Sequence, residues 1–479
     1  MTDADLSNLR QAGVRWIRLL YCDCAGLRKC RVVSIDSWPA TLEHGISVCE
    51  GNSAATAFVD AIAPESGMSV SREARLMPVS TPVQLAWHKT HAMVCTELHT
   101  TPGAPDDVCH RSRLRQLVDT LAESNIDVLL GFETEFYLLS NQQHAQSAPE
   151  LTAVDQSLYC QTYALNNVAQ ALDDMGSALQ QCGIKVEQMH AESGHGQFEI
   201  ATGPADPVAA ADRLVMTREI IAGVAASHGM TACFLPKPFA GQSGSACHVH
   251  ISLWRDGRNL FQDMRLPVGP GAPREAAAGT GASGELGESG LCEAFMAGLL
   301  KHLPALALWT LPSPLSGARV RPSTWSGAFR AWGVCNREAV LRVCLNPQAT
   351  SALNVEYKAI DNCANPYLAL AAILCAGKLG MRQRQLLPAP CEGDPAELGD
   401  EERARRGIHP LDASLASSLA AWDEDTELQE EMDSRLSSAL LRCFVAVRRH
   451  ENKLWTEQFD SLGKTWELHG YPTWLLKRY

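Results

Sequence analysis

Carboxylate and imidazole side chains recur at two-residue spacing in several strand-like segments of this sequence. Glu133 and Glu135 alternate within the apolar run 131–136, Gly-Phe-Glu-Thr-Glu-Phe. Side chains two residues apart on a strand point to the same face, so these two carboxylates share a face. Such a pair is costly on an apolar strand unless a cation neutralises it. The alternative is an edge strand whose polar face meets water, because charged side chains prefer solvent.

Three further segments of the same kind favour a cation site. Glu192 and Glu199 lie in segment 190–199, His248, His250 and Ser252 alternate along 247–253, and Glu356 and Lys358 alternate within 354–358. Five carboxylates and a histidine on strand-like segments can form a cage for hard divalent cations. Carboxylate oxygens with an occasional imidazole suit Mg²⁺ or Mn²⁺, and the sequence therefore predicts a site for one of these ions.

Length and charge exclude several classes of protein. A chain of 479 residues is expected to form two domains or one large α/β unit. The net charge of −13 and the scattered basic residues disfavour nucleic-acid binding. Apolar runs fall short of a membrane span, and the N-terminus is unlike a signal peptide, so a cytoplasmic protein is expected. The 17 cysteines include no CxxC pair, which argues against a disulfide framework or a zinc ribbon.

The order of the predicted elements suggests a small β-rich region followed by a larger mixed one. A β-hairpin is predicted over 14–34, and a Pro/Gly/Asp-rich linker over 101–107 marks the expected domain boundary. Helical periodicity predicts helices over 113–124, 168–182, 208–229, 291–303 (ending at Pro304) and 365–380. The Gly/Ala/Pro-rich segment 266–290 is predicted to be a mobile surface loop.

With these pieces placed, the chain resembles the glutamine synthetase family over nearly its full length. The resemblance is carried by the motifs at 131–136, 190–199, 237–252, 336–342 and 356–368, in family order. The run 322–328 with Trp332 and Gly333 is closer to the FluG-type (nodulin-type) branch. The resemblance implies an α+β fold. A small β-grasp-like N-terminal domain (1–107) would precede a catalytic domain (108–479) with a curved antiparallel sheet and flanking helices.

The resemblance also assigns roles to individual residues. Glu135, Glu192 and Glu199 match the ligands of one metal, and Glu133, His248 and Glu356 match those of a second. Two or three Mg²⁺ or Mn²⁺ ions per active site would act with ATP as co-substrate. Arg342 matches a phosphate-contacting arginine near Arg337, and Arg319 matches the residue that clamps the substrate's α-carboxylate; each arginine could instead be a surface charge. His250, Ser252 and Lys237 match positions near ATP, and Gly244 lies in the substrate loop.

Four positions depart from the family pattern. Trp325 stands where ammonia-using members carry a flap glutamate, and an indole cannot act as a base; the alternative for Trp325 is a plain packing role. Glu50 replaces an aspartate of the ammonium site. Lys358 replaces an arginine and cannot reproduce its bidentate fork, and Ser243 replaces an asparagine. These changes put the identity of the amine in question.

The leading hypothesis is an ATP-dependent ligase that couples the γ-carboxylate of glutamate to an amine other than, or besides, ammonia. A ring-forming structural or regulatory homologue with little turnover is the alternative from another class, and an ordinary glutamine synthetase is the third. The family further implies self-association into stacked rings, as a dodecamer, with active sites between subunits. No nucleic acid or membrane partner is expected.

Overall fold

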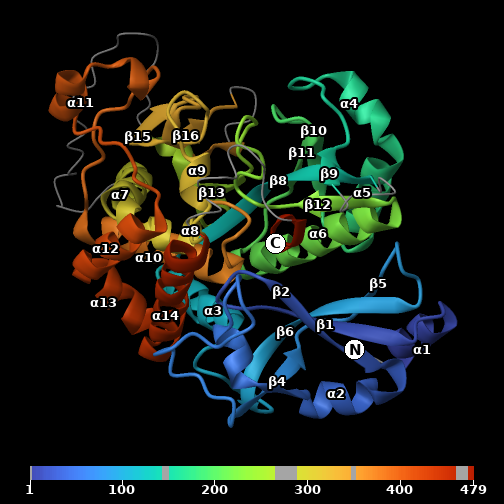
Figure 1. Cartoon of the computed structure of the whole chain (residues 1–479). Helices are drawn as coiled ribbons and strands as arrows, with labels where there is room; N and C mark the ends of the chain where they lie inside the picture. Colours follow the sequence, from blue (N-terminus) through green and yellow to red (C-terminus); the bar gives the residue numbers. More distant parts are fainter. Residues whose placement is uncertain (1–2, 143–149, 265–287, 347–351, 460–472) are drawn as a thin grey trace.

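The computed structural model describes residues 3–142, 150–264, 288–346, 352–459 and 473–479. Two β-sheets dominate it, and helices pack mainly around the larger one (Figure 1). The fold is therefore mixed α+β, as predicted. The smaller sheet is built from the first part of the chain and lies at the bottom of Figure 1, below the larger sheet.

The N-terminal sheet has the strand order β2-β1-β6-β4-β3. Its strands are β1 (Trp16–Cys22), β2 (Arg28–Ser34), β3 (Ile46–Cys49), β4 (Glu73–Pro78) and β6 (His91–Thr101), and the short β5 (Val83–Gln84) and β7 (Ala104–Pro105) pair with β6. β1 and β2 are antiparallel, so the hairpin predicted over 14–34 is confirmed, while β1 runs parallel to β6. The buried side chains of Ile17, Leu19, Trp38, Leu76 and Val94 form a separate small core.

The segment predicted as a linker belongs in part to this first sheet. β6 continues to Thr101, and β7 turns back to pair with it. The Pro-Gly pair at 102–103 supplies the turn, where Gly103 has a φ of 85°. The strands before residue 107 lie in one sheet and those after it in the other, but the domain boundary itself stays a prediction.

The larger sheet has the strand order β10-β11-β8-β13-β17-β16-β15. Its strands are β8 (Asp127–Gln142), β10 (Val186–Ala191), β11 (Gln197–Thr202), β13 (Cys247–Arg255), β15 (Phe329–Val334), β16 (Ala339–Cys344) and β17 (Asn354–Tyr357). The short β9 (Glu150–Ala153) and β12 (Met230–Cys233) pair with β8, and β14 (Arg258–Asn259) pairs with β13. β8, which carries Glu133 and Glu135, is an interior strand with neighbours on both sides. The edge-strand alternative for these glutamates is therefore wrong.

The predicted helices are found, with shifted ends. They are α3 (His110–Ala122), α5 (Ala169–Gln181), α6 (Pro207–Ser227), α7 (Glu288–Lys301) and α10 (Pro366–Gln383). The Asp206 and Asn365 side chains cap α6 and α10 by accepting backbone N–H bonds, and a proline follows each cap. Pro304 does not simply end a helix: α8 (Leu303–Thr310) begins one residue before it, because proline is tolerated in a first helical turn.

The remaining helices surround these elements. They are α1 (Asp3–Gln11), α2 (Trp38–His44), α4 (Thr162–Asn167), α9 (Ser316–Arg319), α11 (Asp400–Arg406), α12 (Leu415–Glu424), α13 (Thr426–Arg435), α14 (Ser438–Leu454) and α16 (Thr473–Leu476). Of the 266–290 segment only residues 288–290 are described, and they open α7; the rest of the predicted loop lies outside the described residues.

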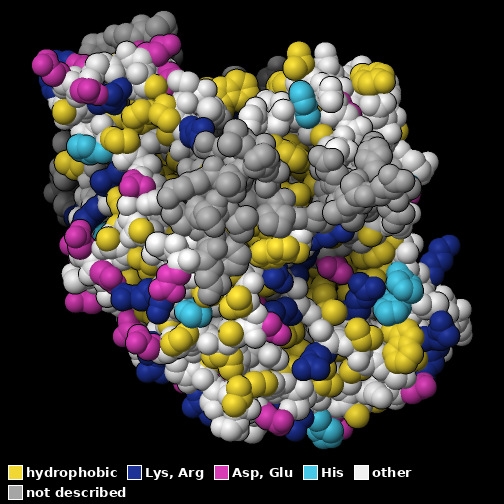
Figure 2. Space-filling model, viewed as in Figure 1, with side chains coloured by type: hydrophobic (Ala, Val, Ile, Leu, Met, Phe, Trp, Pro, Cys, Tyr) yellow, Lys and Arg dark blue, Asp and Glu magenta, His cyan; other side chains and the backbone are white. Residues whose placement is uncertain are grey.

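The state of the cysteines, the distribution of charge and the character of the helices can be compared with the sequence predictions. All 17 cysteines are free thiols. Acidic and basic side chains are interspersed over the face shown in Figure 2, in line with the scattered basic residues of the sequence. Among the described residues, no single helix is both long and apolar enough to cross a membrane. The consecutive helices 290–301 and 303–310 pass that test only jointly, and they are bent by 77° relative to each other.

Candidate active site

The register of the larger sheet brings the predicted polar residues into one row. Glu135 on β8 lies directly opposite Glu199 on β11, and Glu133 lies opposite His248 on β13. Further along, Glu356 on β17 lies between His250 on β13 and Arg342 on β16. Because residues two apart on a strand share a face, the charged side chains from five neighbouring strands line up on one side of the sheet. The row is the structural basis of the site.

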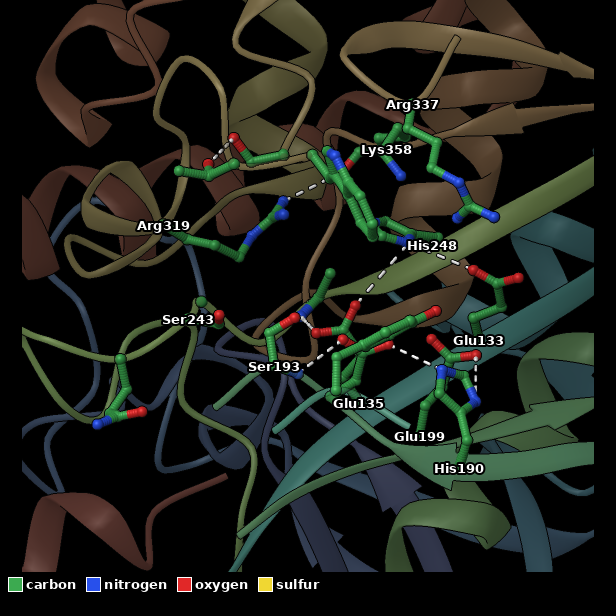
Figure 3. Close-up of a pocket in the computed structure, with 18 of the residues that line it drawn as sticks. Glu133, Glu135, His190, Ser193, Glu199, Ser243, His248, Arg319, Arg337 and Lys358 are labelled. Atoms are coloured by element: carbon green, nitrogen blue, oxygen red, sulfur yellow. Dashed lines mark hydrogen bonds and ion pairs between the residues drawn. The ribbon is translucent and has the colours of Figure 1, made fainter. Parts of the chain in front are cut away.

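A cavity of about 620 Å³ lies over this row. It contains the six predicted metal ligands, hereafter the cage: Glu133, Glu135, Glu192, Glu199, His248 and Glu356. It is also lined by other residues that the sequence singled out: Lys237, Ser243, Gly244, Arg319, Trp325, Arg337, Arg342 and Lys358. In Figure 3 the carboxylates lie on the sheet side, and Arg319, Lys358 and Arg337 lie across from them. The cage residues are therefore gathered, as predicted.

One half of the cage is almost purely acidic. Glu135 and Glu199 are buried side by side. The sequence suggested that Glu192 lies on a strand, but it comes directly after the last residue of β10. His190 completes this group: its Nε2 lies 2.9 Å from Glu192 Oε1, and its Nδ1 lies 3.9 Å from Glu199 Oε1. His190, Glu192 and Glu199 each offer a ligand atom within 4.8 Å of the others. That spacing suits a shared cation.

The pKa values of two carboxyls in this acidic half are raised by burial and by like charge, and Arg319 and Lys358 only partly offset this at Glu135. Burial, reinforced by the carboxylate of Glu192, raises the pKa of Glu135 to about 8. Burial and the carboxylates of Glu133 and Glu135 raise the pKa of Glu199 well above its usual range. Within the described residues, no Lys or Arg lies within 4 Å of these two carboxylates. A divalent cation would relieve this crowding of like charges.

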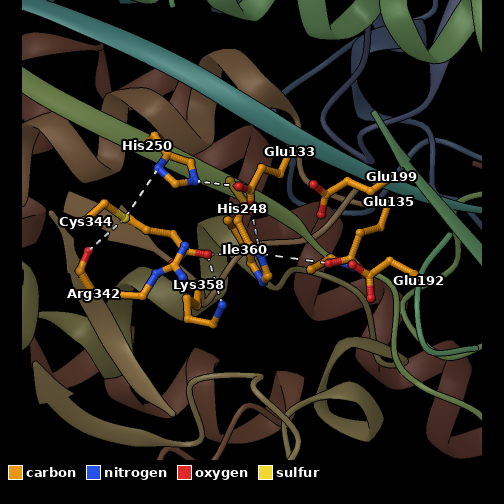
Figure 4. A network of polar contacts seen from close by, with 12 residues as sticks. Glu133, Glu135, Glu192, Glu199, His248, His250, Arg342, Cys344, Lys358 and Ile360 are labelled. Atoms are coloured by element: carbon orange, nitrogen blue, oxygen red, sulfur yellow. Dashed lines mark hydrogen bonds and ion pairs between the residues drawn. The ribbon is translucent and has the colours of Figure 1, made fainter. Parts of the chain in front are cut away.

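In the other half of the cage, the carboxylates lie beside two histidines and beside the positive charges of Arg342 and Lys358. His250 Nε2 lies 2.9 Å from Glu133 Oε1 (Figure 4), and His248 Nδ1 lies 3.2 Å from Glu356 Oε1. Glu356 also meets Arg342 Nε at 2.5 Å and Lys358 Nζ at 3.0 Å. Burial alone would raise the pKa values of Glu133 and Glu356, but these neighbours outweigh it and hold both pKa values below the usual range.

This second half can also hold a cation, although with less negative charge to offer. Glu133, His250 and Glu356 bring three ligand atoms within 4.8 Å of one another. His248 Nε2 is buried without a hydrogen-bond partner among the described residues, which leaves it free to act as a ligand. Burial lowers the pKa of His248 to about 4, so its imidazole is neutral, the form that binds metals. Oxygen donors with imidazole suit Mg²⁺ or Mn²⁺.

Arg319 is held between the segment that follows β17 and the loop that contains Gly244. The guanidinium donates through Nη2 to the backbone carbonyls of Lys358 and Ile360, at 3.1 and 3.2 Å. Gly244 lies so close that a Cβ there would be 2.2 Å from Arg319 Cγ. Gln197 Nε2 donates to both Glu135 Oε2 and Gly244 O at 2.9 Å. The Gly244 loop, Arg319 and Glu135 of the cage are thereby fixed relative to one another.

A second cavity, of about 340 Å³, adjoins the first at Glu133. Its lining is mostly apolar and includes Phe132, Pro204, Trp254 and Leu353. His250 and Ser252, which the sequence places near ATP, line this cavity, whereas Lys237 and Arg342 line the larger one. The predicted ATP residues are thus divided between two connected spaces.

Comparison with known proteins places this geometry in a family. A family model described as the catalytic domain of glutamine synthetase matches residues 107–471. This chain belongs to the glutamine synthetase family. A solved structure described as a novel glutamine synthase homolog matches the glutamine synthetase fold of this chain with a TM-score of 0.77 and 30% identity, covering 95% of this chain and 98% of that one. The predicted family and fold are confirmed.

Curated relatives agree with this placement. A gamma-glutamylpolyamine synthetase of Streptomyces coelicolor is 34% identical over 443 residues, covering 92% of this chain and 90% of that protein. A glutamine synthetase of Thermotoga maritima is 30% identical over 469 residues, covering 97% of each chain. The protein fluG of Emericella nidulans is 31% identical over 389 residues, which are 79% of this chain and 40% of that protein. The chain is therefore an enzyme of the glutamine synthetase type, a ligase.

Glu50 lies outside the cavity of this glutamine synthetase homologue. It opens a short 3₁₀ turn (Glu50–Ala54) beside the N-terminal sheet, and its Oε2 accepts hydrogen bonds from Arg72 Nε at 2.7 Å and Ser69 N at 3.0 Å. Within one chain Glu50 therefore cannot join the cage. Its predicted role requires the cavity of another subunit.

Three residues that contribute to the site were not singled out by the sequence. His190 stands two residues before Glu192, the same alternation that revealed the other ligands, so this signal was present. Gln197 fixes Glu135, and the Asn362 amide donates to the backbone carbonyls of Glu135 and Ala246, at 3.0 Å each. Uncharged amides give no charge pattern, and only the structure reveals their partners.

Proposed function

We propose that this chain is an ATP-dependent ligase that activates the γ-carboxylate of glutamate, or a close analogue, and couples it to an amine other than, or besides, ammonia. The family membership supports ligase chemistry, and the names of its relatives include both ammonia-using and polyamine-using enzymes. The acidic cage supports binding of Mg²⁺ or Mn²⁺.

The observation that carries the choice of amine is Trp325. It lines the cavity and is 46% exposed, at the position where the resemblance puts the flap glutamate of ammonia-using members. An indole neither attracts an ammonium ion through a full negative charge nor accepts a proton from it. A flat apolar surface at this place instead favours an amine that carries a carbon substituent.

The proposed reaction has two steps. A γ-carboxylate oxygen attacks the γ-phosphorus of ATP, and ADP leaves, which gives an acyl phosphate. The amine nitrogen then attacks the acyl carbon, phosphate leaves, and the nitrogen loses a proton to give the amide. Divalent cations in the cage would neutralise charge on the phosphoryl group being transferred. Arg342, Arg337 and Lys358 extend this positive charge along the cavity wall, and Arg319 would orient the α-carboxylate through charge-assisted hydrogen bonds.

The second cavity is the proposed site of the adenine ring. Its apolar lining, with Phe132 and Trp254, suits a flat base, and Ser252 adds a hydroxyl. From there the triphosphate would extend toward the cage past Glu133 and Gln188, which line both cavities.

The proposal is tested by glutamate-dependent phosphate release from ATP with Mg²⁺, across ammonia, alkylamines, ethanolamine and polyamines. We expect turnover with at least one substituted amine at a higher kcat/KM than with ammonia. Preference for ammonia would reject the Trp325 argument, and no turnover with any amine despite ATP binding would favour the structural or regulatory alternative. Glu135→Ala and Glu356→Ala should each abolish activity and weaken Mn²⁺ binding while the protein stays folded; unchanged Mn²⁺ affinity in both would remove the cage assignment.

We further infer that the protein forms rings in which Glu50 faces the cavity of a neighbouring subunit. Glu50 does not line its own chain's cavity and instead pairs with Arg72; together with the family resemblance, this supports the arrangement. Light scattering on the eluting protein should give the mass of a multimer, of the order of a dodecamer if the family's stacked rings are kept. A monomer that is fully active would contradict the inference.

A further inference from the structure

Two aromatic rings form a continuous wall between the cage and the segment 322–328, hereafter the flap. The ring of Tyr159 lies edge-on to His190, with centroids 5.7 Å apart, and edge-on to Trp325, with centroids 6.0 Å apart. All three side chains line the main cavity. Tyr159 and Trp325, hereafter the aromatic wall, are 41% and 46% exposed. Both therefore present open apolar surface to whatever enters beside the acyl group.

The flap holds Trp325 in a strained backbone conformation. Ser323 and Trp325 both have a φ of 56°, in the left-handed region that is sterically unfavourable for a bulky residue. The conformation is fixed from outside: Trp325 N donates to Glu338 Oε1 at 3.0 Å, and Ser323 Oγ donates to Asp394 Oδ2 at 2.7 Å. These two bonds hold the backbone in the conformation in which Trp325 lines the cavity.

The charges around the aromatic wall disfavour a second ammonium group on the substrate. The five carboxylates that line the main cavity all belong to the cage. Arg337 already lies over the Trp325 ring, with its guanidinium carbon 5.2 Å from the ring centroid. A distant cation on the amine would meet this arginine and find no uncommitted carboxylate among the described residues of the lining. Glu50, if supplied by a neighbouring subunit, is neutralised by Arg72.

We propose that the aromatic wall selects primary amines whose substituent is an uncharged alkyl or aryl group, in preference to polyamines and ammonia. The inference rests on the proposed function and names the substrate class of the same site. The substituent would pack against Tyr159 and Trp325 while the amino group faces the cage side. Aromatic contacts of this kind contribute about 0.5–1.5 kcal/mol beyond the area they bury, so each ring accounts for up to about tenfold in affinity.

The test compares amines of similar reach that differ in charge. The full-length protein is assayed with ATP, Mg²⁺ and glutamate for phosphate release, and the γ-glutamyl product is identified by mass spectrometry. Butylamine and benzylamine present neutral substituents, whereas putrescine has a second ammonium group. We expect kcat/KM for one of the neutral-substituent amines to exceed that for putrescine and for ammonia by about tenfold or more. Higher kcat/KM for putrescine or for ammonia would overturn the inference.

Substitutions in the aromatic wall distinguish an effect on amine binding from a general effect on catalysis. Trp325→Ala and Tyr159→Ala should raise KM for the preferred amine about tenfold while leaving KM for glutamate within about twofold. Tyr159→Phe keeps the ring and should raise KM for the preferred amine less than Tyr159→Ala does. Tyr163→Ala is the matched control, because this tyrosine is 67% exposed and lies outside the cavity. Equal loss with every amine, or the same loss from Tyr163→Ala, would overturn the inference.

The two proposals fail in distinguishable ways. Absence of glutamate-dependent phosphate release with every amine, ammonia included, would overturn the proposed function. Product formation with putrescine as the best substrate would leave the proposed function in place and overturn only the role of the aromatic wall, whereas ammonia as the best substrate would also reject the Trp325 argument. Because Tyr159 lies outside the strained flap, its variants keep the test valid even where a change at Trp325 prevents folding.

Discussion

Replacing Glu135 by glutamine should stabilise the metal-free protein, although it removes a residue of the proposed active site. Both hydrogen bonds that Glu135 accepts, from Gln197 Nε2 and Ala246 N, end on its Oε2 at 2.9 Å. The amide oxygen of glutamine can accept both. The substitution therefore removes a buried acid while keeping its shape and its hydrogen bonds.

The magnitude follows from the pKa of this carboxyl. Burial and Glu192 raise the pKa of Glu135 from 4.5 to about 8. In this interval the folded chain holds a proton that the unfolded chain releases, so the free energy of unfolding falls as pH rises from 4.5 to about 8. At 1.36 kcal/mol per pH unit, the loss is roughly 4 kcal/mol at about pH 7.5. We expect Glu135→Gln to recover on the order of 2–4 kcal/mol, or about 2–4 °C in Tm for a chain of this length.

Thermal unfolding of the chelator-treated protein measures this effect. Near neutral pH the variant should melt above the parent, and the difference should shrink toward about pH 5. Mg²⁺ or Mn²⁺ should raise the Tm of the parent more than that of the variant, because a bound cation neutralises the acids. Glu187→Gln is the control: this exposed glutamate on the edge strand pairs with Lys185 at 2.8 Å. A variant that melts at or below the parent without metal, or that gains as much from metal, would refute the reasoning.

Three further predictions concern single residues. Gly244→Ala places a Cβ 2.2 Å from Arg319 Cγ and should raise KM for glutamate about tenfold with ATP affinity unchanged; an unchanged KM in initial-rate kinetics would exclude Arg319 as the clamp. Burial raises the pKa of Glu451 from 4.5 to about 7. Between these pH values the folded chain keeps a proton that the unfolded chain releases, so the free energy of unfolding falls as pH rises. Urea unfolding should show a flatter pH dependence in Glu451→Gln, and an unchanged slope would contradict this. Arg448→Met leaves Glu451, 3.0 Å from the guanidinium, buried without its cation and should cost about 3–5 kcal/mol of unfolding free energy. The double variant with Glu451→Gln should recover most of it; no recovery would argue against the pair.

The sequence predicted which residues gather in the site better than how they are arranged. Glu133 with Glu135 and His248 with His250 alternate at the period of a strand, which places each pair on one face whatever the partner strands are. The pairing of β8 with β11 and β13 joins segments far apart in sequence, and tertiary packing rather than local pattern sets it. The interior position of β8 therefore could not be predicted from Glu133 and Glu135 alone.

The aromatic wall and the flap illustrate what local patterns leave out. Tyr159 lies in a loop where neither periodicity nor charge distinguishes it from a surface residue. The sequence singled out Trp325 only through its place in the family motif. Its positive φ accompanies bonds between segments far apart in the chain, from Trp325 to Glu338 and from Ser323 to Asp394. Helix positions were predicted well where a capping residue precedes proline, as at 206–207 and 365–366, because that signal is local.

Cage residues alternate along interior strands, and this limits which insertions and deletions the protein can tolerate. Inserting one residue into β8 ahead of Glu133 would turn both of its carboxylates to the opposite side of the sheet, away from Glu199 and His248. Inserting two would restore their direction but shift them by one repeat along the strand. Lineages descended from this protein should therefore tolerate changes of length in the connections between strands, while the cage residues keep their positions within β8, β11 and β13.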